Sequence, residues 1–444
     1  MRRNINRMVA LAIGISVMSG SIMPVFAADT QSTPTVNVQT NQKPVLTLDD
    51  AIKSAISISD TLVLDEQKIA YQDKINDLNK KQDDFNKVTD ELEKYDDDTS
   101  DANLNQAKQQ SDFDEDSVIQ KVIDQYNNIV TSQMQIDMAT KNLAVENTQL
   151  DNAKFKQSIG AETSIDIKTL QLQIQKDQNT LNTNINKLND AEYTFKVLIG
   201  KDVNQYTLVK DIKFEQFKID GSIDDYLDNI INSDLKYTEQ LLNISKDYYN
   251  GKDYESDNKI TIDDLNTAKG LAEEAQQDKS TLSEPSSDGN DLNAYQKYED
   301  SLSKDSGKIN AYTSLLTKRL SFLNSRLNNY KTENTITETK KTLKDQLKSY
   351  YTNLKTYEDN INYCKNQIEL NNEILSNYKL KYDLGMITET VYDAQAVSTE
   401  QTDIDLRNAI ISYNQNKEYI QKPWIASASS SSSSSSQSSK SKSS

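Results

Sequence analysis

Apolar residues recur at seven-residue steps in two long stretches of the chain, and a glycine lies between the two halves of each stretch. These glycines are Gly160 and Gly385. Such a repeat is typical of helices that pack along a narrow seam, and glycine readily adopts the left-handed backbone that a tight reversal needs. The pattern therefore predicts two helical hairpins. In the first, the repeat comprises Val122, Ile129, Ile136, Leu143 and Leu150, then Ile167, Ile174, Leu181, Leu188 and Phe195.

The second hairpin has the fuller seam. Its positions alternate steps of four and three, the a/d pattern of a coiled coil, and a strict seven-residue repeat implies a left-handed supercoil. Cys364 falls on this seam, which favours a small core residue over a nucleophile, and a single cysteine excludes an internal disulfide. The seam comprises Leu343, Leu347, Tyr350, Leu354, Tyr357, Ile361, Cys364, Ile368, Asn371, Leu375, Tyr378 and Tyr382, then Val397, Ile404 and Ile411, beside Leu406, Tyr413 and Ile420.

Seams in the first hairpin are only half apolar, because their partner positions include Gln133, Thr140 and Asn147. A narrow stripe suits helices that bury one edge and leave much of their surface in water. A single chain cannot bury so many thin seams at once. We therefore expect copies of the chain to associate and cover the remainder.

Composition supports long helices and excludes several functions. The chain has 444 residues, 35% of them hydrophobic, with ten glycines and five prolines, which predicts an all-α fold with few or no β-strands. A net charge of −18 argues against nucleic acid as a partner. Histidine is absent, and the chain lacks a phosphate-binding loop, a nucleophile elbow and a dinucleotide fingerprint. We expect no enzyme, no cofactor and no metal site.

The ends of the chain predict export. Residues 1–27 combine a basic start, an apolar run and a small-residue cleavage site at Ala27, as a secretory signal does. Residues 28–45 read as a flexible leader and 427–444 as a disordered serine-rich tail. No later segment is apolar over 18 residues, so no membrane-spanning helix is expected.

Between these ends the sequence predicts two helical repeats, 46–221 with its tip at Gly160 and 222–426 with its tip at Gly385. Their openings, Thr47-Leu-Asp-Asp-Ala-Ile and Ser222-Ile-Asp-Asp-Tyr-Leu, match. From the opening to the tip glycine the first repeat takes 112 residues (Leu48 to Gly160) and the second takes 162 (Ile223 to Gly385), which indicates an insertion of about 50 residues at about 250–306.

Two further segments lie beside the helices. Residues 96–112 are acidic and aperiodic, which predicts a turn region after a helix over 60–95. Residues 201–221 alternate apolar and polar positions and predict one or two short strands.

The opening Leu46-Thr-Leu-Asp-Asp-Ala-Ile52, the tip Ser158-Ile-Gly-Ala-Glu-Thr-Ser-Ile-Asp-Ile167 and the tip Asp383-Leu-Gly-Met-Ile-Thr-Glu-Thr-Val-Tyr392 resemble TolC-like outer-membrane efflux proteins. The resemblance covers most of residues 46–422. It implies that three copies form a helical conduit whose tips meet a membrane-fusion adaptor and gate the pore. The matching positions are Gly160, Thr163 and Asp166, then Gly385 and Thr388. Six residues after its glycine the first tip has Asp166, whereas the second tip has Val391. A gate of acidic side chains is therefore in doubt at the second tip.

One departure concerns the membrane. The family places two membrane-spanning strands in each repeat, yet residues 96–113 and 251–310 lack about 9–11 residues of alternating hydrophobicity. We therefore expect a divergent member without these strands, standing in the wall of a single-membrane bacterium, or in the outer membrane and periplasm if the family pattern holds. The alternative is a coiled-coil envelope scaffold or surface protein that does not transport.

The hairpin tips and one acidic loop are candidate binding sites, and each also has a purely structural interpretation. Thr163 and Thr388 are expected to cap the returning helices, with Asp166 completing a capping box, so the tip residues could serve the turn alone. The loop Asp253–Asp264 places oxygen ligands at positions 1, 3, 5 and 12, as calcium loops do, but a solvated acidic turn is the default interpretation.

Overall fold

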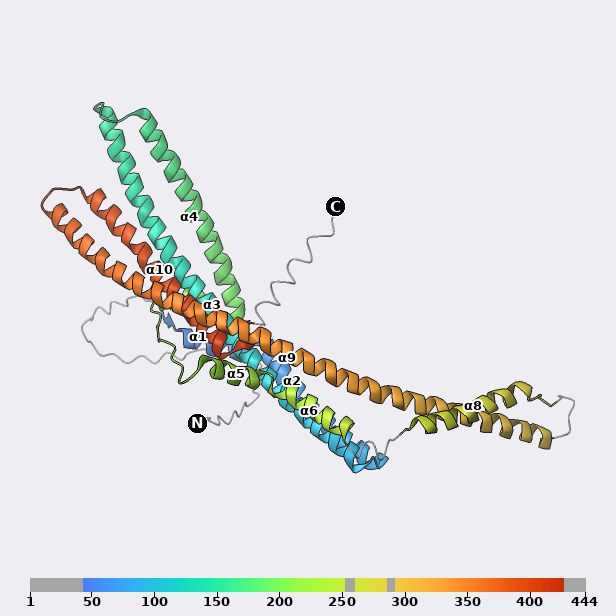
Figure 1. Ribbon diagram of the computed structural model, residues 1–444. Helices are drawn as coiled ribbons and strands as arrows, with labels where there is room; N and C mark the ends of the chain where they lie inside the picture. The colour runs from blue at the N-terminus through green and yellow to red at the C-terminus, as the bar shows by residue number, and fades with distance from the viewer. Residues whose placement is uncertain (1–42, 252–259, 286–291, 427–444) are drawn as a thin grey trace, which may run out of the picture. The chain divides into compact units, whose positions relative to one another are not determined.

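The structure is a computed structural model that describes residues 43–251, 260–285 and 292–426, and nearly all of these are helical. The predicted all-α fold with few strands is confirmed. The helices are α1 (Leu48–Ile58), α2 (Asp60–Asn86), α3 (Asp90–Ser158), α4 (Ser164–Ile199), α5 (Ile223–Asp234), α6 (Lys236–Asn250), α8 (Ile262–Thr281), α9 (Leu292–Asp383) and α10 (Glu389–Gln421), with a 3₁₀ turn at Val203–Gln205 and strands β1 (Val45–Leu46) and β2 (Thr207–Leu208) (Figure 1).

The two predicted hairpins are present. Helices α3 and α4 pack together on either side of Gly160, and α9 and α10 do so on either side of Gly385 (Figure 1). The seven-residue pattern identified most of the seam correctly, including Cys364 as a buried residue. Buried seam residues are Val122, Ile129, Leu143, Leu150, Ile167, Leu181 and Phe195 in the first hairpin, and Leu347, Leu354, Ile361, Cys364, Val397, Ile404, Tyr413 and Ile420 in the second.

The first repeat has its main core where α1, α3 and α4 meet the two strands. Strand β1 pairs in parallel with β2, so Leu46 lies opposite Leu208 and Val45 belongs to the sheet. The Tyr126 hydroxyl donates to the Leu46 carbonyl oxygen at 2.9 Å and accepts from the Val209 amide at 2.8 Å. This one side chain therefore fixes both strand segments to α3. The core contains Leu46, Ala51, Ala55, Val118, Val122, Tyr126, Ile129, Val130, Phe195, Ile199, Val203 and Leu208.

A second core lies where α5, α9 and α10 meet. Residues of the connection between the repeats, including Phe214 and Phe217, pack against it. The Tyr413 hydroxyl accepts from the Phe217 amide at 2.6 Å and donates to Glu358 at 3.2 Å. Tyr413 thus fixes this connection to α10 much as Tyr126 fixes the strands to α3. The core contains Leu227, Ile231, Leu347, Leu354, Ile361, Ala409, Ile410, Tyr413 and Ile420.

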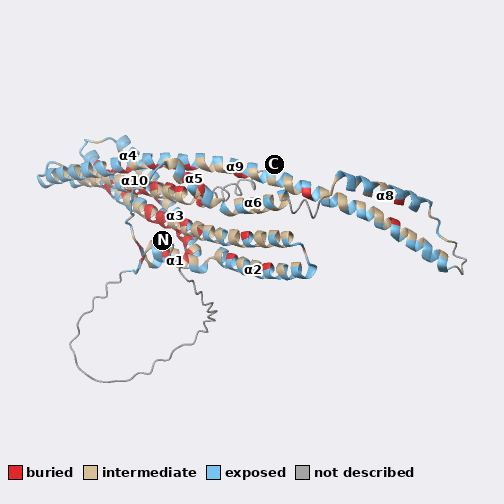
Figure 2. Cartoon of the chain, turned by 60° about the horizontal axis from the view of Figure 1, so that its bottom comes forward, coloured by how far each residue is buried: buried red, intermediate tan, exposed pale blue. Residues whose placement is uncertain are grey.

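Arg407 joins the two repeats. Its side chain is buried, and its guanidinium donates to Asn127 Oδ1 at 2.8 Å, to Thr131 Oγ1 at 3.2 Å and to the carbonyl oxygen of Lys210. Burial lowers the pKa of this guanidinium from its usual value, and Tyr126 and Asp211 oppose that change. The three acceptors come from α3 and the connection, so α10 is locked to both. Figure 2 shows buried residues gathered where α1, α3, α5 and α10 lie, with few along α2 and α8.

The prediction of a turn at 96–112 was wrong, because these residues lie inside α3. The turn lies at Lys87–Thr89, where Lys87 adopts a left-handed φ of 52° and Thr89 caps α3. Residues 96–112 are held by polar contacts rather than by an apolar seam. These include Asn76 Nδ2 to the Ser100 carbonyl oxygen at 3.1 Å and Gln109 Nε2 to the Ser233 carbonyl oxygen at 2.9 Å. A search for apolar periodicity therefore missed them.

Four helices form a layer in the order α2, α3, α6 and α9, because α3 contacts both α2 and α6, and α6 contacts α9. Successive helices run in opposite directions. The aromatic stack of Tyr95 on Tyr248, at 4.3 Å between ring centroids, joins α3 to α6, and Ser245 Oγ donates to Asn329 Oδ1 at 2.8 Å between α6 and α9. Each repeat therefore contributes two helices to this layer, α2 and α3 from the first and α6 and α9 from the second.

The predicted insertion contains α8 and the beginning of α9, which pack on each other. Residues 252–259 of the candidate calcium loop lie outside the described residues. The last residue of that loop, Asp264, is described. Its carboxylate accepts from the Thr261 amide at 2.8 Å and from the Thr261 hydroxyl at 2.6 Å, and it thereby caps α8. The predicted signal sequence, residues 28–42 of the leader, and the serine-rich tail also lie outside the described residues.

Candidate functional site: the hairpin tips

The first tip is a helix end closed by a left-handed glycine. Gly160 has a φ of +78°, and its amide donates to the Gln157 carbonyl oxygen at 2.9 Å. The Ala161 amide donates to the Lys156 carbonyl oxygen at 2.8 Å. These two bonds are the Schellman arrangement, which satisfies carbonyl groups that a helix end leaves free. A Cβ at Gly160 would meet nothing within 4 Å, so only the backbone angle requires glycine there.

The second tip repeats this geometry residue for residue. Gly385 has a φ of +69°, its amide donates to the Tyr382 carbonyl oxygen at 2.9 Å, and the Met386 amide donates to the Lys381 carbonyl oxygen at 2.8 Å. A Cβ here would also meet nothing within 4 Å. Two independent segments of the sequence therefore produce the same reversal, as the duplication predicted.

The caps of the returning helices differ. Thr163 and Asp166 form a full capping box: the Asp166 amide donates to Thr163 Oγ1 at 3.2 Å, and the Thr163 amide donates to Asp166 Oδ2 at 3.1 Å. Hydrogen bonds from the Thr163 hydroxyl and amide lower the pKa of Asp166. Thr388 occupies the cap position of α10, but its side chain accepts no capping bond. Val391 stands where Asp166 stands in the first tip, so the second tip also lacks a carboxylate to accept from the Thr388 amide.

The tips also expose apolar side chains that the sequence analysis did not single out. Ile159 and Leu384 directly precede the two glycines and are 66% and 65% exposed. Phe155 and Leu380 each lie five residues before their glycine and are also exposed. An alignment of the two tip sequences on their glycines would have revealed these apolar residues at the same two positions. Each tip therefore presents an apolar pair at the same place relative to its turn.

Charged and aromatic groups distinguish the tips further. Lys156 lies 3.9 Å from Glu162 in the first tip. In the second, Tyr382 stacks on Tyr392 at 5.8 Å between centroids. Lys379 lies near both rings and pairs with Asp383 at 2.8 Å, which raises the pKa of the Lys379 ammonium. The second tip is therefore more aromatic, and its charges are paired beside the rings.

The two hairpins are joined to each other close to their tips. Asn152 Nδ2 donates to Thr390 Oγ1 at 3.4 Å, and Lys141 pairs with Glu400 at 2.6 Å between α3 and α10. These contacts bring the predicted residues of both tips to one end of the paired hairpins (Figure 1). A partner that approaches this end meets both tips.

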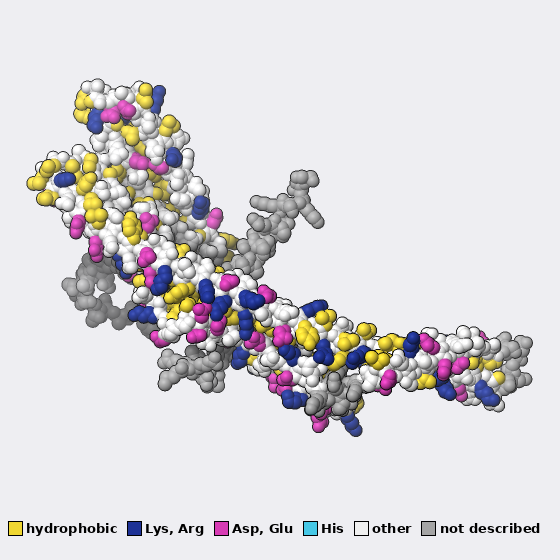
Figure 3. Space-filling model, viewed as in Figure 1, with side chains coloured by type: hydrophobic (Ala, Val, Ile, Leu, Met, Phe, Trp, Pro, Cys, Tyr) yellow, Lys and Arg dark blue, Asp and Glu magenta, His cyan; other side chains and the backbone are white. Residues whose placement is uncertain are grey.

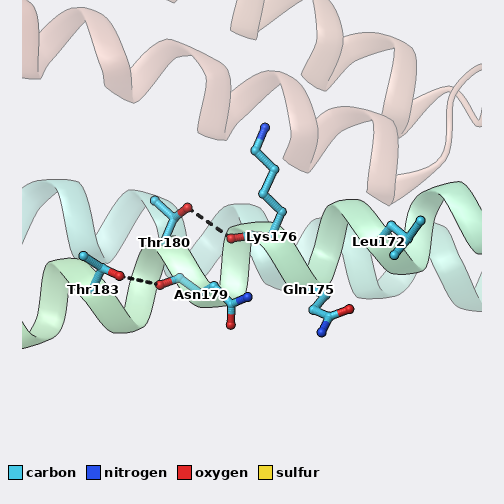
Figure 4. Close-up of a pocket in the computed structure, with 6 residues that line it drawn as sticks. All are labelled: Leu172, Gln175, Lys176, Asn179, Thr180 and Thr183. Carbon is cyan, nitrogen blue, oxygen red and sulfur yellow. Dashed lines mark hydrogen bonds between the residues drawn. The ribbon is translucent and has the colours of Figure 1, made fainter.

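The described surface contains an open depression along the middle of α4. It is lined by Leu172, Gln175, Lys176, Asn179, Thr180 and Thr183 (Figure 4). Thr180 and Thr183 donate to backbone carbonyl groups one turn earlier, at 3.1 and 2.9 Å. Their hydroxyl groups are therefore occupied by the helix, and the depression has no cluster of chemically active groups. Among the described helices, none is long and apolar enough to cross a bilayer.

Comparison with known proteins identifies the fold. No protein family model matches the chain, and no curated protein matches it. Among solved structures it is similar to the outer-membrane channel OprN, with a TM-score of 0.52 and 11% identity over 91% of this chain and 99% of that chain. It is also similar to a membrane protein from Pseudomonas aeruginosa, with a TM-score of 0.51 and 10% identity over 91% and 99% of the chains. The TolC-like fold that the opening and tip motifs predicted is therefore confirmed.

Proposed function

We propose that this chain is an export component of the cell envelope, in which three copies form a helical conduit that docks a membrane-fusion adaptor through its hairpin tips. The observation that carries the proposal is the pair of identical tip reversals at Gly160 and Gly385, on a fold shared with an outer-membrane channel. A turn alone needs no exposed apolar pair. Two matching pairs at one end suit a partner that packs helix against helix.

Association of copies follows from surface chemistry. Thin apolar seams leave large side chains exposed along the described helices, among them Leu172, Tyr193 and Tyr363. Water-exposed apolar area is removed when copies pack together, at roughly 25 cal/mol per Å². Mass photometry of residues 28–426 is expected to give one closed assembly of three copies. A stable monomer at micromolar concentration would contradict the conduit.

The docking proposal is tested with the double variants Gly160→Val with Gly385→Val, and Ile159→Glu with Leu384→Glu. The probe is a purified helical hairpin from a membrane-fusion adaptor of the same cell. We expect adaptor capture to fall while helicity by circular dichroism stays largely intact, because the backbone strain of valine at each left-handed position is confined to the turn, and both apolar residues face solvent. Ile262→Glu with Leu292→Glu, on two exposed apolar residues of α8 and the start of α9 away from the tips, is the control. Capture that is unchanged in both double variants would refute docking through the tips.

The alternative, a coiled-coil scaffold without transport, shares self-association but not adaptor capture. Self-association together with no capture by the unaltered chain would therefore favour the scaffold. Fractionation of cells that make the full chain tests the proposed envelope location, where we expect the protein in the wall or outer-envelope fraction. Recovery in the cytoplasm would contradict it.

A further inference from the structure

Two acids of the described helices have an oxygen that lacks a hydrogen-bond donor. Figure 3 shows Asp and Glu side chains interspersed with Lys and Arg on the surface, where water can satisfy them. Asp65 Oδ2 of α2 and Glu146 Oε2 of α3 differ, because each is buried without a hydrogen bond within the described residues. Buried acceptors without a donor are rare in native proteins because they are costly. Each of these two oxygens therefore calls for a donor nearby.

The first oxygen lies beside a second carboxyl group, that of Asp114. Lys80 of α2 pairs with Asp97 of α3 at 3.5 Å. Because the two helices run antiparallel, this register places Asp65 level with the turn of α3 that contains Asp114. The Asp65 side chain is deeply buried, with the residue only 4% exposed. Two carboxyl groups that share such a place repel each other strongly when both are ionised.

The neighbours of the two acids decide which of them carries the charge. Lys68 Nζ lies 2.9 Å from Asp65 Oδ1, so Asp65 is the ionised member. Burial raises the pKa of Asp114, Gln110 and Lys68 lower it, and the Asp65 carboxylate raises it further. Gln110 Nε2 donates to Asp114 Oδ1 at 3.1 Å, which leaves Oδ2 of Asp114 to carry a proton.

A second pair of the same kind joins α3 to α4. Leu150 of α3 packs with Ile174 of α4 in a small core of the first hairpin. Glu146 lies one turn before Leu150, and Asp177 lies three residues after Ile174, so the antiparallel helices bring the two carboxyl groups to the same level. The unsatisfied Oε2 of Glu146 thus also lies beside another acid.

The neighbours of this pair again separate a charged member from a protonated one. Gln173 Nε2 donates to Asp177 Oδ2 at 2.6 Å, which stabilises the Asp177 carboxylate. Burial raises the pKa of Glu146, the Asp177 carboxylate raises it further, and Asn142 lowers it. Asn142 Nδ2 donates to Glu146 Oε1 at 2.9 Å, which leaves Oε2 of Glu146 to carry a proton.

We propose that each pair shares one proton, so that Asp114 donates to Asp65 Oδ2 and Glu146 donates to Asp177. Each proton satisfies the oxygen that otherwise lacks a donor and leaves one negative charge where two would repel. When the pH rises, the proton passes to water or hydroxide, and two carboxylates face each other between the helices. The contacts of α2 and α4 with α3 therefore weaken as the pH rises. These contacts lie within one chain and do not depend on the proposed conduit.

Other charged groups lie on the adjoining turns without neutralising either pair. Around the first pair they are Glu66 of α2, Asp112, Glu115 and Asp116 of α3, and Lys422 of the C-terminal segment. Around the second pair they are Lys141 of α3, Lys176 of α4, and Glu400 and Asp403 of α10. Lys422 is held by Asp116 at 2.9 Å, and Lys141 is held by Glu400 at 2.6 Å. These two ammonium groups are therefore occupied by other acids.

Native-state hydrogen exchange of the full chain at pH 5.5 and pH 8, corrected for the intrinsic rates of the amides, tests the proposal. The chain carries Asp234→Asn, because burial raises the pKa of Asp234 to about 6 and would add a pH dependence of its own. We expect protection of α2 and α4 to fall at least about tenfold between the two pH values, the change that one pKa unit produces. Equal protection at both would overturn the proposal.

Asp114→Asn and Glu146→Gln are the decisive variants, because each amide group keeps a donor toward its partner and cannot lose it at pH 8. We expect α2 in the first variant and α4 in the second to keep their protection at pH 8, within about twofold. Asp73→Asn on α2 and Asp190→Asn on α4 remove exposed acids and should leave the tenfold fall unchanged. A fall that persists in the amide variants, or one that disappears in the controls, would count against the shared protons.

Infrared spectroscopy provides a readout that does not depend on how the helices move. At pH 5.5 ordinary Asp and Glu side chains are mostly ionised. The Asp234→Asn chain should then show the carbonyl band of two protonated carboxyl groups, and adding Asp114→Asn with Glu146→Gln should remove it. Adding Asp73→Asn with Asp190→Asn should keep it. An unchanged band in the amide variant would overturn the proposal. So would calcium that restores protection at pH 8, since the pairs would then bind a metal ion.

Discussion

The centre of the chain and its long helical arms are built on opposite principles. At the centre, apolar side chains such as Leu354 and Phe195 are almost completely buried. The side chains of Tyr126 and Arg407 there form hydrogen bonds with the strands, with α3 and with the connection between the repeats. Along α2 the buried side chains are polar, and apolar side chains such as Leu64, Tyr71 and Phe85 are exposed. The centre therefore buries its apolar side chains within one chain, whereas α2 leaves most of its apolar side chains exposed to water. Variants that change one region and spare the other test this division.

The largest expected loss of stability comes from a buried leucine of α9, compared with an exposed leucine of the same helix. Leu354→Ala should reduce the free energy of unfolding by about 2–5 kcal/mol, because Leu354 is 1% exposed and leaves a cavity. Leu327→Ala, on a side chain that is 49% exposed, should change it by less than about 0.5 kcal/mol in samples dilute enough to be monomeric. Urea unfolding followed by circular dichroism measures both. Equal losses would remove the distinction between centre and arms.

Arg407→Met is expected to lower stability by about 2–3 kcal/mol. The substitution leaves Asn127 Oδ1 and the Lys210 carbonyl oxygen buried without their donor. Lys340→Met serves as the control, since Lys340 is a partly exposed cation of α9 that bonds Asn232. Urea titration compares them. If Arg407→Met is as mild as its control, the junction between repeats does not depend on this residue.

Asp234 makes the centre sensitive to pH. Burial at the end of α5 raises the pKa of its carboxyl group from 3.8 to about 6. The native state then binds the proton more tightly than the unfolded chain, so stability falls as the pH rises from about 4 to about 6. A shift of this size corresponds to at most about 3 kcal/mol, and partial solvation reduces it to about 1–2 kcal/mol.

Asp234→Asn removes this penalty. We expect a gain of about 1–2 kcal/mol near pH 7 and almost none near pH 4, measured by urea unfolding at both values. Asp263→Asn, on an exposed acid of α8, is the control variant and is measured in the same way. A gain for Asp234→Asn that is equal at both pH values would show that the pKa is not the cause.

The smallest expected effect compares the two tips. Thr163→Ala should destabilise the start of α4 by about 1 kcal/mol, because its hydroxyl accepts from the Asp166 amide. Thr388→Ala should cost only a few tenths of a kcal/mol, since Thr388 makes no side-chain cap. Native-state hydrogen exchange of amides in the first turns of α4 and α10 measures the difference. Identical changes in protection would mean that the capping box adds nothing to the first tip.

The parts of the fold that sequence reasoning reached are those that depend on apolar spacing and on turns. Ile129, Leu354 and Ile361 were placed correctly on buried seams, and Gly160 and Gly385 were placed at the reversals. A left-handed position favours glycine whatever surrounds it, so this signal is local.

The parts it missed depend on polar contacts between distant segments. The run Asp96–Asp98 has no apolar period and was read as a turn, although Lys80 and Asn76 of α2 hold this segment in α3. Thr89, followed by Asp90 and Glu91, was a visible helix start that would have placed the turn correctly. Arg407 gave no signal at all, because its acceptors are more than 190 residues away in the sequence.

The position of Arg407 and Tyr413 in the last long helix has a consequence for synthesis. Both residues bond segments made much earlier, Asn127 and Lys210 in one case and Phe217 in the other. Until α10 has been made, the hydrogen-bonding groups of these earlier segments have no partner from α10. The bonds of Arg407 and Tyr413 can therefore form only after α10 has been made, whereas α3 and α6 can join the two repeats earlier through the stack of Tyr95 on Tyr248.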